Sequence, residues 1–459
     1  MTQGPRHLSL TFLGATGTVT GSKYLLDTGD CQVLVDCGLF QGYKQLRLRN
    51  WAPLPLAPAA LDAVVLTHAH LDHSGALPLL VRQGFRGRAF CTRETAMLCK
   101  ILLPDSGRLQ ELDAEYANRE GFSRHHPARP LYTEEDATYA LKRLKSIDFG
   151  GEFQIAHGLS GAYTPAGHIL GAASLRVSGD GLPSVVFSGD LGRQNDLMMD
   201  PPAPRSAAEY VVIESTYGDR THPTEGPDDA LLEVIRRTTR RGGVVVIPAF
   251  AVGRAQALLV LLDRMLRRGQ IPELPIYLDS PMASAVTELY SEHLSAQKLS
   301  GEELRAALRV AQPVDTSDES RAVDRRGGPA IIISASGMAT GGRVLHHLKR
   351  FLPDENSAVV LAGFQAGGTR GAALARGASH IKIHGRHVPV RAEVVQFDSL
   401  SAHADREELL AWLASGPPPR QVFITHGEPD SAESLRMAIQ ERLGWGCTIP
   451  EYRQTCELV

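Results

Sequence analysis

The stretch LDAVVLTHAHLDHSG, residues 61–75, decides which fold the chain can adopt. Ala63 to Leu66 form an unbroken apolar run, which predicts a short buried strand. Four side chains that can ligate a metal follow within six residues, namely His68, His70, Asp72 and His73. On a tight loop that leaves the end of a strand, all four can turn into one cavity. Imidazole and carboxylate groups without a thiolate favour zinc or a similar metal at a catalytic site.

Two pairs of ligands this close together indicate two metal ions rather than one. Two-metal sites hold their ions about 3.5–4 Å apart and hydrolyse phosphoryl or acyl bonds. The alternative is an exposed polar loop with scattered histidines. Because HxHxDH directly after an apolar strand is a specific pattern, we expect a metal-dependent hydrolase instead.

The motif HAHLDHSG, residues 68–75, resembles the signature of the metallo-β-lactamase superfamily. The resemblance implies a four-layered αββα sandwich. It also assigns the first two histidines to one metal, and the aspartate and third histidine to the other. The family takes its remaining ligands from distant loops. This chain offers matching residues in GAYTPAGHILGAAS (161–174), in PSVVFSGDLG (183–192) and in the HGE after the strand at 421–425, namely His168, Asp190 and His426.

The resemblance therefore implies two Zn²⁺ ions, with Mn²⁺ as an alternative. The implied ligands of the first metal are His68, His70, His168 and Asp190, and those of the second are Asp72, His73, Asp190 and His426. Asp36, in LVDCGLFQG (34–42), resembles the family's first motif. There the aspartate orients the ligand loop without binding metal, because ligating imidazoles need their other nitrogen held. The alternative for Asp36 is a residue that forms a turn before glycine.

Two further motifs resemble the β-CASP branch of the superfamily, the nucleases of RNA maturation and decay and of DNA repair. YVVIESTYG (210–218) ends an apolar strand in Glu214, where a plain hydrolase of the superfamily needs no carboxylate. SLSAHAD (399–405) supplies His403. The resemblance implies that His403, supported by Glu214, stabilises developing charge or protonates the leaving oxygen. The implied catalytic residues are Asp72, Asp190, Glu214 and His403.

Residues 219–394 alternate apolar strands with helical stretches, which predicts an α/β domain with a mostly parallel sheet flanked by helices. This domain is expected as an insertion into the αββα sandwich. We therefore expect a first part of the metallo-β-lactamase domain at 1–218, the inserted β-CASP domain at 219–394, and the C-terminal part of the first domain at 395–459. The strand at 394–397 is expected to belong to the first domain.

The charge of the inserted region suggests a polyanionic partner. Between residues 321 and 394 there are eleven Lys or Arg and four Asp or Glu, which gives +7 in a chain of net charge −3. A solvated helical face explains part of this excess. A groove for phosphates explains it better beside a metal site. The residues expected to contact substrate are Ser401, Arg370 and Arg343.

Composition limits the class of protein further. Apolar residues make up 43% of the 459-residue chain and charged residues 22%, as in soluble globular proteins. No stretch reaches the ~18 apolar residues of a membrane span, and the N-terminus lacks the pattern of a signal peptide. The six cysteines form no CxxC pair. We expect a cytoplasmic protein with no membrane partner, and the sequence leaves a homodimer open.

The resemblance leads to hydrolysis of RNA phosphodiester bonds by a hydroxide that bridges two metals. RNA is favoured over DNA because a histidine in the third β-CASP motif, here His426, accompanies the RNA enzymes of the family. The chain is similar to bacterial and archaeal relatives of the cleavage and polyadenylation endonuclease, so endonucleolytic cleavage of single-stranded RNA in processing or decay is expected. The alternatives are a 5′ exoribonuclease of the RNase J type and a small-molecule metallo-hydrolase.

Overall fold

The computed structural model describes residues 7–121, 123, 125–222, 227–293, 297–397 and 400–459. Its internal contacts divide the chain into two compact units. The first unit comprises Met1–Gln41, Gln45–Thr221 and His403–Val459, and the second comprises Gly42–Lys44 and His222–Ala402. The chain therefore leaves the first unit once for a long excursion and returns to it at His403. The domain limits expected at 218/219 and 394/395 stay a prediction.

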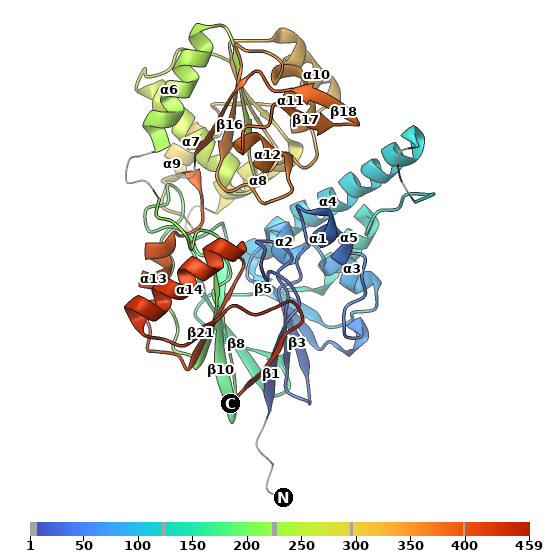
Figure 1. Cartoon of the computed structure of the whole chain (residues 1–459), viewed down its shortest axis with the longest axis vertical. Coiled ribbons are helices and arrows are strands. Elements are labelled where there is room, and N and C mark those ends of the chain that lie inside the picture. The colour runs from blue at the N-terminus through green and yellow to red at the C-terminus, as the bar shows by residue number, and fades with distance from the viewer. Residues whose placement is uncertain (1–6, 122, 124, 223–226, 294–296, 398–399) are drawn as a thin grey trace, which may run out of the picture. The chain divides into compact units, whose positions relative to one another are not determined.

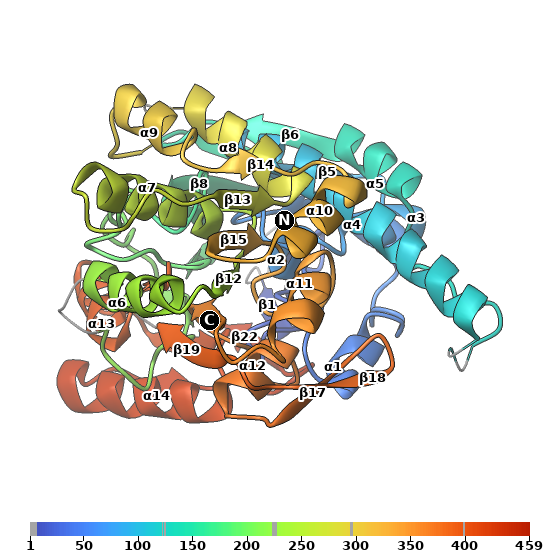
Figure 2. The ribbon, with the colours of Figure 1, turned by 90° about the horizontal axis from the view of Figure 1, so that it is seen from above.

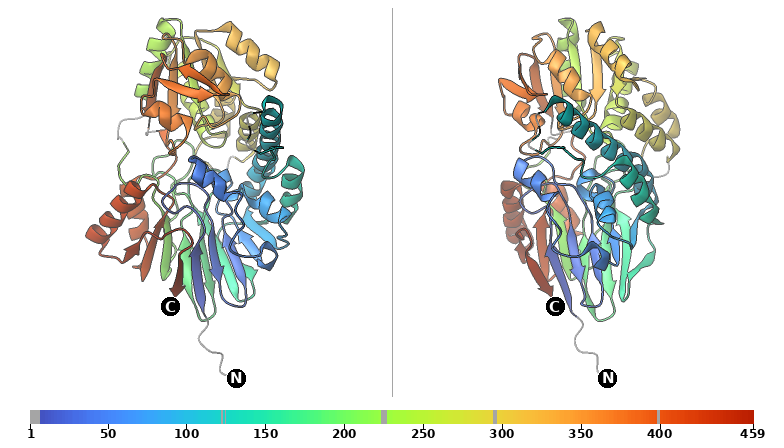
Figure 3. Two further views of the ribbon diagram at one scale, coloured as in Figure 1. Left: turned by 45° about the vertical axis from the view of Figure 1, so that its right-hand side comes forward. Right: turned by 90° about the vertical axis from the view of Figure 1, so that its right-hand side faces the viewer.

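Two seven-stranded sheets face each other in the first unit, with helices on both outer sides (Figures 1 and 3). One sheet has the order β22-β1-β2-β3-β4-β5-β6, and its pairs are antiparallel from β22 to β3 and parallel from β3 to β6. Its strands are β1 (Leu8–Phe12), β2 (Tyr24–Asp27), β3 (Gln32–Val35), β4 (Ala63–Val65), β5 (Arg88–Thr92), β6 (Leu144–Ile147) and β22 (Thr455–Leu458).

The second sheet of this unit has the order β21-β20-β11-β10-β9-β8-β7. Its pairs are antiparallel from β7 to β10 and parallel from β10 to β21. Its strands are β7 (Glu152–Ala156), β8 (Leu159–Pro165), β9 (Ala173–Gly179), β10 (Leu182–Phe187), β11 (Tyr210–Glu214), β20 (Gln421–Thr425) and β21 (Cys447–Thr448). The expected αββα sandwich is confirmed.

Alternation along the strands builds the core between these two sheets. In β1, Leu8, Leu10 and Phe12 face the opposite sheet, which contributes Val185 and Phe187 from β10. Successive side chains of a strand point to opposite faces, so each strand supplies every second residue to this core. The two inner faces hold the sheets together and fix the strand ends that carry the candidate site.

Helices cover the outer faces of the sandwich (Figure 1). The covering helices are α3 (Leu77–Arg82), α4 (Arg93–Glu120), α5 (Glu134–Ala140), α13 (Arg406–Ala414) and α14 (Pro429–Leu443), whereas α1 (Lys44–Arg49) and the one-turn α2 (Leu71–Ser74) lie at one end of the sheets. The Thr92 side chain accepts a hydrogen bond from the Thr95 N–H and begins α4, and Gly121, at φ 65°, ends it. Asp405 and Glu408 form a capping box at the start of α13.

The second unit contains one parallel sheet between two layers of helices (Figure 2). The order is β14-β13-β15-β12-β16-β19, and all its pairs are parallel. Its strands are β12 (Val244–Pro248), β13 (Ile276–Asp279), β14 (Gln312–Pro313), β15 (Ala330–Ser334), β16 (Ala358–Ala362) and β19 (Glu393–Phe397). A separate hairpin joins β17 (His380–Ile383) to β18 (Arg386–Pro389).

The four central strands, β12, β13, β15 and β16, are buried on both faces, which explains why they are nearly continuous apolar runs. Val244 and Val246 pack with Leu345 and Leu348 of α11, whereas α6 and α7 lie on the other face (Figure 2). The helices are α6 (Pro227–Arg240), α7 (Arg254–Arg267), α8 (Pro281–Glu292), α9 (Gly301–Ala307), α10 (Ser317–Arg326), α11 (Val344–Phe351) and α12 (Arg370–Ala375). The expected α/β insertion is confirmed.

One strand was assigned to the wrong unit. The sequence led us to expect the strand at 394–397 in the first domain, but β19 pairs with β16 in the sheet of the second unit. The strand lies at the edge of that sheet, where Glu393–Phe397 pairs in parallel with Ala358–Ala362 of β16.

None of the described helices combines the length and apolar character that a membrane crossing needs.

Candidate metal centre

The HxHxDH segment begins at the end of β4 and continues into a one-turn helix. The expectation of a loop that carries all four side chains is wrong in part, because Asp72 and His73 lie on α2. His70 precedes α2, and its carbonyl accepts the N–H of His73 at 2.9 Å. The turn of helix places Asp72 and His73 beside each other, while His68 and His70 remain on the extended segment before it.

Three imidazoles and one carboxylate oxygen form the first group of candidate ligands. The Nε2 atoms of His68 and His168 lie 3.2 and 3.3 Å from Nδ1 of His70. Oδ2 of Asp190 lies 3.4 Å from His68 Nε2 and 3.6 Å from His168 Nε2. The edge of a tetrahedron with zinc–nitrogen bonds of about 2.0–2.1 Å measures about 3.3 Å. The donor atoms are therefore spaced as a tetrahedral zinc site requires.

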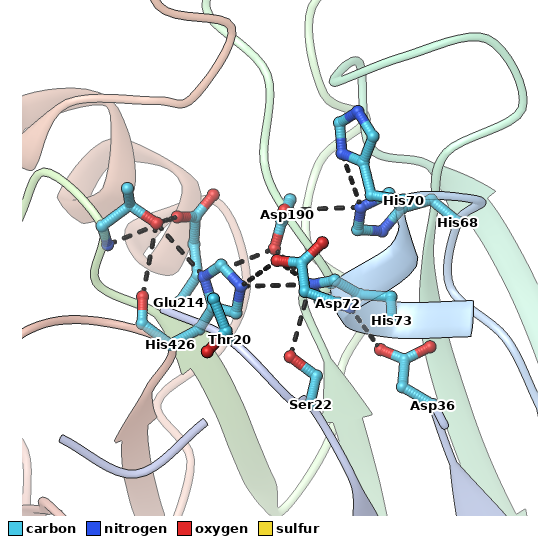
Figure 4. Close-up of polar contacts among 12 residues, drawn as sticks. Thr20, Ser22, Asp36, His68, His70, Asp72, His73, Asp190, Glu214 and His426 are labelled. Atoms are coloured by element: carbon cyan, nitrogen blue, oxygen red, sulfur yellow. Dashed lines mark hydrogen bonds and ion pairs between the residues drawn. The ribbon is translucent and has the colours of Figure 1, made fainter. Parts of the chain in front are cut away.

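The second group lies on the other side of Asp190 (Figure 4). The Nε2 atoms of His73 and His426 are 3.1 Å apart, and Oδ2 of Asp72 is 3.4 Å from His426 Nε2. Oδ1 of Asp190 is 3.2 Å from His73 Nε2. Asp190 thus turns one oxygen to each group. This arrangement brings together every residue that the sequence assigned to the two metals, and the donor set fits two zinc ions.

The distant candidate ligands all follow the ends of strands of one sheet. His168 comes after β8, Asp190 after β10 and His426 after β20. His426 adopts φ 49°, and its N–H donates to the carbonyl of Ala15 at 2.7 Å. A left-handed conformation is unfavourable for a residue with a side chain, so this hydrogen bond helps hold His426 toward the site.

Asp36 holds the segment that carries His73. Its Oδ2 lies 2.7 Å from His73 Nδ1, and its Oδ1 accepts the N–H of Thr67 at 2.7 Å. Asp36 is 1% exposed and adopts φ 57°. These contacts fix the ring orientation of His73 and direct its Nε2 toward Asp190 and His426.

Glu214 and His403 form a hydrogen-bonded pair beside the two groups. Nδ1 of His403 lies 3.1 Å from Glu214 Oε2, and Nε2 lies 4.0 Å from Asp190 Oδ2. Glu214 is itself held, because it accepts the Leu191 N–H at 2.7 Å and the hydroxyl of Thr216 at 2.5 Å. The carboxylate therefore fixes one nitrogen of His403 and leaves the other facing the candidate ligands.

Burial and charge shift the pKa values of this cluster in opposite directions. Burial lowers the pKa of His68 well below its ordinary value, which favours the neutral imidazole that a metal needs. Burial also acts against protonation of His73, but Asp190 and Asp36 raise its pKa well above the ordinary value. For His403, Glu214 outweighs the effect of burial and raises the pKa to about 9.

Three residues expected to contact substrate lie in the second unit. The guanidinium of Arg343 donates to Oδ1 of Asp279 and to the Val314 carbonyl, both at 2.8 Å. Arg370 donates to the backbone carbonyl of Lys382 at 2.7 Å. Ser401 is buried. The two arginines thus have their guanidinium groups bonded within their own unit.

Sequence reasoning missed the hydroxyl side chains that support the site. Thr216 Oγ1 lies 3.2 Å from His426 Nδ1 as well as beside Glu214, and Ser22 Oγ lies 3.3 Å from His73 Nε2. Thr67 Oγ1 lies 3.1 Å from His68 Nδ1. Thr216 stands inside ESTYG and Thr67 directly before the HxHxDH segment, so their place in those motifs was the available signal.

Comparisons with known proteins agree with this architecture. A metallo-β-lactamase superfamily model matches residues 16–240, a Beta-Casp domain model matches 255–374, and a model of the Zn-dependent metallo-hydrolase RNA specificity domain matches 387–450. Ribonuclease TTHA0252 of Thermus thermophilus is 40% identical over 433 residues, which cover 92% of this chain and 94% of that protein. The chain belongs to the β-CASP branch of the metallo-β-lactamase superfamily. The resemblance drawn from the sequence motifs is thereby confirmed.

More distant relatives extend the same family. Transcription termination factor FttA of Methanocaldococcus jannaschii is 33% identical over 463 residues, which cover 96% of this chain and 70% of that protein. A solved structure of a protein of unknown function from Enterococcus faecalis covers 98% of this chain and 100% of that one. With a TM-score of 0.50 and 15% identity, it supports the fold alone.

Proposed function

We propose that this chain is a zinc-dependent ribonuclease that cleaves single-stranded RNA endonucleolytically. The observation that carries the proposal is the Glu214–His403 pair beside two groups of His and Asp ligands that share Asp190. Ligands alone would serve many hydrolases. A histidine fixed by a buried carboxylate beside them supplies the acid–base group that cleavage of a phosphodiester needs.

Seven side chains would hold two zinc ions. The first ion would take His68, His70, His168 and Asp190, and the second would take Asp72, His73, Asp190 and His426. Zinc bound there would lower the pKa of a water to near neutrality and neutralise the non-bridging oxygens of a phosphate. Asp36 would keep the His73 ring in place through its 2.7 Å contact to Nδ1.

His403 would act on the leaving oxygen. Glu214 fixes its Nδ1 and favours the protonated ring, so Nε2 can donate a proton toward the site where the phosphodiester breaks. Asp72 and Asp190 contribute negative charge that favours the same protonated state. Ser401 stands two positions before His403 in the chain. We assign its hydroxyl to a contact with a phosphate of the substrate.

Three observations support RNA as the proposed substrate. The model matched by residues 387–450 describes an RNA specificity domain, and the relative that is 40% identical carries the name ribonuclease. The net charge of +7 between residues 321 and 394 favours a polyanion. Because Arg343 and Arg370 are hydrogen-bonded within their unit, we propose that they attract phosphates through their charge and not through direct hydrogen bonds.

The test is cleavage of an internally structured single-stranded RNA labelled at either end, with zinc-loaded protein and a matched DNA beside it. We expect internal fragments from both labels. Chelation and the Asp190→Ala substitution should abolish them, whereas Asp30→Ala, at an exposed aspartate of the same unit, should not. Release of mononucleotides from one end would contradict the endonucleolytic mode and favour the exonuclease alternative. Absence of cleavage with two zinc ions bound would contradict the ribonuclease and favour a small-molecule hydrolase.

A further inference from the structure

Two large apolar side chains are exposed just after the segment that carries Asp36. Leu48 is 54% exposed and Trp51 is 57% exposed, and α1 buries none of its residues. The N–H of Trp51 donates to the Leu48 carbonyl at 3.1 Å, so the helical turn extends past the end of α1. Side chains three positions apart are neighbours on such a turn. Leu48 and Trp51 therefore form one exposed apolar surface.

The backbone that carries Leu48 and Trp51 is fixed by contacts of the two residues between them. Asn50 accepts the Phe40 N–H at 2.9 Å and donates to the Phe40 carbonyl at 2.8 Å. The guanidinium of Arg49 lies 4.1 Å from the ring centroid of Tyr452 and 5.5 Å from that of Phe40. These contacts order the backbone around Leu48 and Trp51, so an incoming ligand does not have to order it.

The neighbours of Phe40 are hydrogen-bonded to segments of the candidate metal centre. The Leu39 N–H donates to the carbonyl of Leu71 in α2 at 2.8 Å, and the Gln41 N–H donates to Thr20 Oγ1 at 3.1 Å. Thr20 is drawn beside His426 in Figure 4. In Figures 1 and 3, α1 lies at the same end of the two sheets as α2. The exposed surface is thus on the side of the unit where the candidate ligands gather.

The charge around this surface identifies the kind of ligand. Between Cys37 and Leu61 the chain has three basic residues, Lys44, Arg47 and Arg49, and no acidic one. Arg47 is exposed next to Leu48. An exposed indole with neighbouring cations suits a ligand that has both flat aromatic faces and negative charge. Single-stranded nucleic acid has both, since its bases stack on aromatic side chains and its phosphates bind cations.

We propose that Arg47, Leu48 and Trp51 bind a nucleotide of the single-stranded RNA outside the metal centre. A base stacks on the indole of Trp51 against Leu48, and Arg47 contacts the adjoining phosphate. This inference rests on the proposed ribonuclease function. It adds to that function a positioning surface on the first unit, one that holds the strand while a neighbouring phosphodiester occupies the metal centre.

Binding is measured with zinc-loaded His403→Ala protein, so that the RNA stays intact, and with a fluorescent single-stranded RNA of about 12 nucleotides. Trp51→Ala should weaken binding about 5- to 100-fold, because a base–aromatic stack contributes that much affinity. Trp51→Phe should retain most of the affinity. Arg47→Ala should reduce the slope of log affinity against log salt by about 0.7, as expected for one lost phosphate contact to a single strand. Met437→Ala, at an exposed apolar residue of α14, is the matched control.

Tryptophan fluorescence provides a second readout. Of the three tryptophans, Trp412 is buried and Trp445 is partly buried, so Trp51 is the most exposed indole and the one expected to respond to a stacked base. RNA should quench the parent protein, and Trp51→Phe should remove that quenching. In the active enzyme, Trp51→Ala should raise KM for long RNA and leave kcat and the zinc content as in the parent.

Two results would overturn the inference. One is that Trp51→Ala and Arg47→Ala bind RNA with the same affinity and the same salt dependence as the parent. The other is a parent dimer that Trp51→Ala converts to a monomer with unchanged RNA affinity, because the surface would then join two copies of the chain. Failure of the proposed function is distinguishable. In that case the parent enzyme cuts no RNA, whereas the loss of binding in Trp51→Ala remains measurable.

Discussion

Replacement of His347 tests a buried ion network that stabilises the second unit. Nε2 of His347 lies 2.7 Å from Asp279 Oδ2, and Nδ1 lies 2.7 Å from Asp324 Oδ1. Both ring nitrogens face carboxylates, so both must carry a proton. Arg343 donates to Oδ1 of Asp279, and the Ser320 hydroxyl donates to the same Oδ2 that His347 contacts. The network is therefore complete only when His347 is a cation.

The magnitude follows from the pKa of His347. Burial lowers it, but the hydrogen bonds that the ring donates to Asp279 and Asp324 outweigh burial and raise it from 6.5 to about 9. A rise of about 2.5 in pKa, at about 1.36 kcal/mol for each unit, amounts to about 3 kcal/mol. Because the pKa is higher in the folded state, this stability is present in full below about pH 6.5. It is lost as the pH rises through about 9.

The assay is native-state hydrogen exchange at amides of β13 and β15, which reports opening of this unit without assuming that the whole chain unfolds in one step. We expect His347→Gln to lower the free energy of opening relative to the parent at pH 6. This loss should be about 3 kcal/mol larger at pH 6 than at pH 10. His346→Gln, at the neighbouring position on α11, should keep the pH dependence of the parent from about pH 7.5 to pH 10, because burial lowers the pKa of His346 below 6.5. Parent and His347→Gln curves that run parallel from pH 6 to pH 10 would refute the reasoning.

Two further substitutions test the candidate metal centre. Asp36→Ala removes the 2.7 Å contact that orients His73, so zinc affinity should fall about 10- to 100-fold, measured by competition with a chromophoric chelator, while Asp30→Ala keeps the parent value. Unchanged zinc affinity in Asp36→Ala would show that His73 does not need this support. His403→Ala should lower kcat for RNA cleavage about 10²- to 10⁴-fold with zinc content near that of the parent. Loss of zinc in proportion to activity would contradict its role in proton transfer.

The gathering of the candidate ligands could be predicted from the sequence because these residues follow the ends of apolar strands. His168, Asp190 and His426 each stand at such an end, and strands of one sheet bring their ends together. Helical geometry at Asp72 and His73 was not predicted, since a four-residue helix is too short to leave a periodic pattern.

Partners far apart in the sequence explain the other misses. The strand expected at 394–397 looked like a return to the first domain, and only the register of β19 with β16 assigns it to the second unit. Counting charges suggested that Arg343 is available to substrate. Its bond to Asp279, 64 positions away, could not be read from composition. Hydrophobic pattern and charge counts predict secondary structure and the sign of the local charge. Contacts between residues far apart in the sequence decide which side chains remain available to bind substrate.

The central claim is that two zinc ions at this cluster carry out RNA cleavage, and a zinc titration of metal-free protein tests it most directly. Cleavage of an internally labelled RNA is followed as zinc is added to a known concentration of protein. We expect activity to rise to a plateau at two equivalents of zinc, and Asp190→Ala to remain inactive throughout. Full activity at one equivalent, or cleavage that persists without metal, would contradict the account.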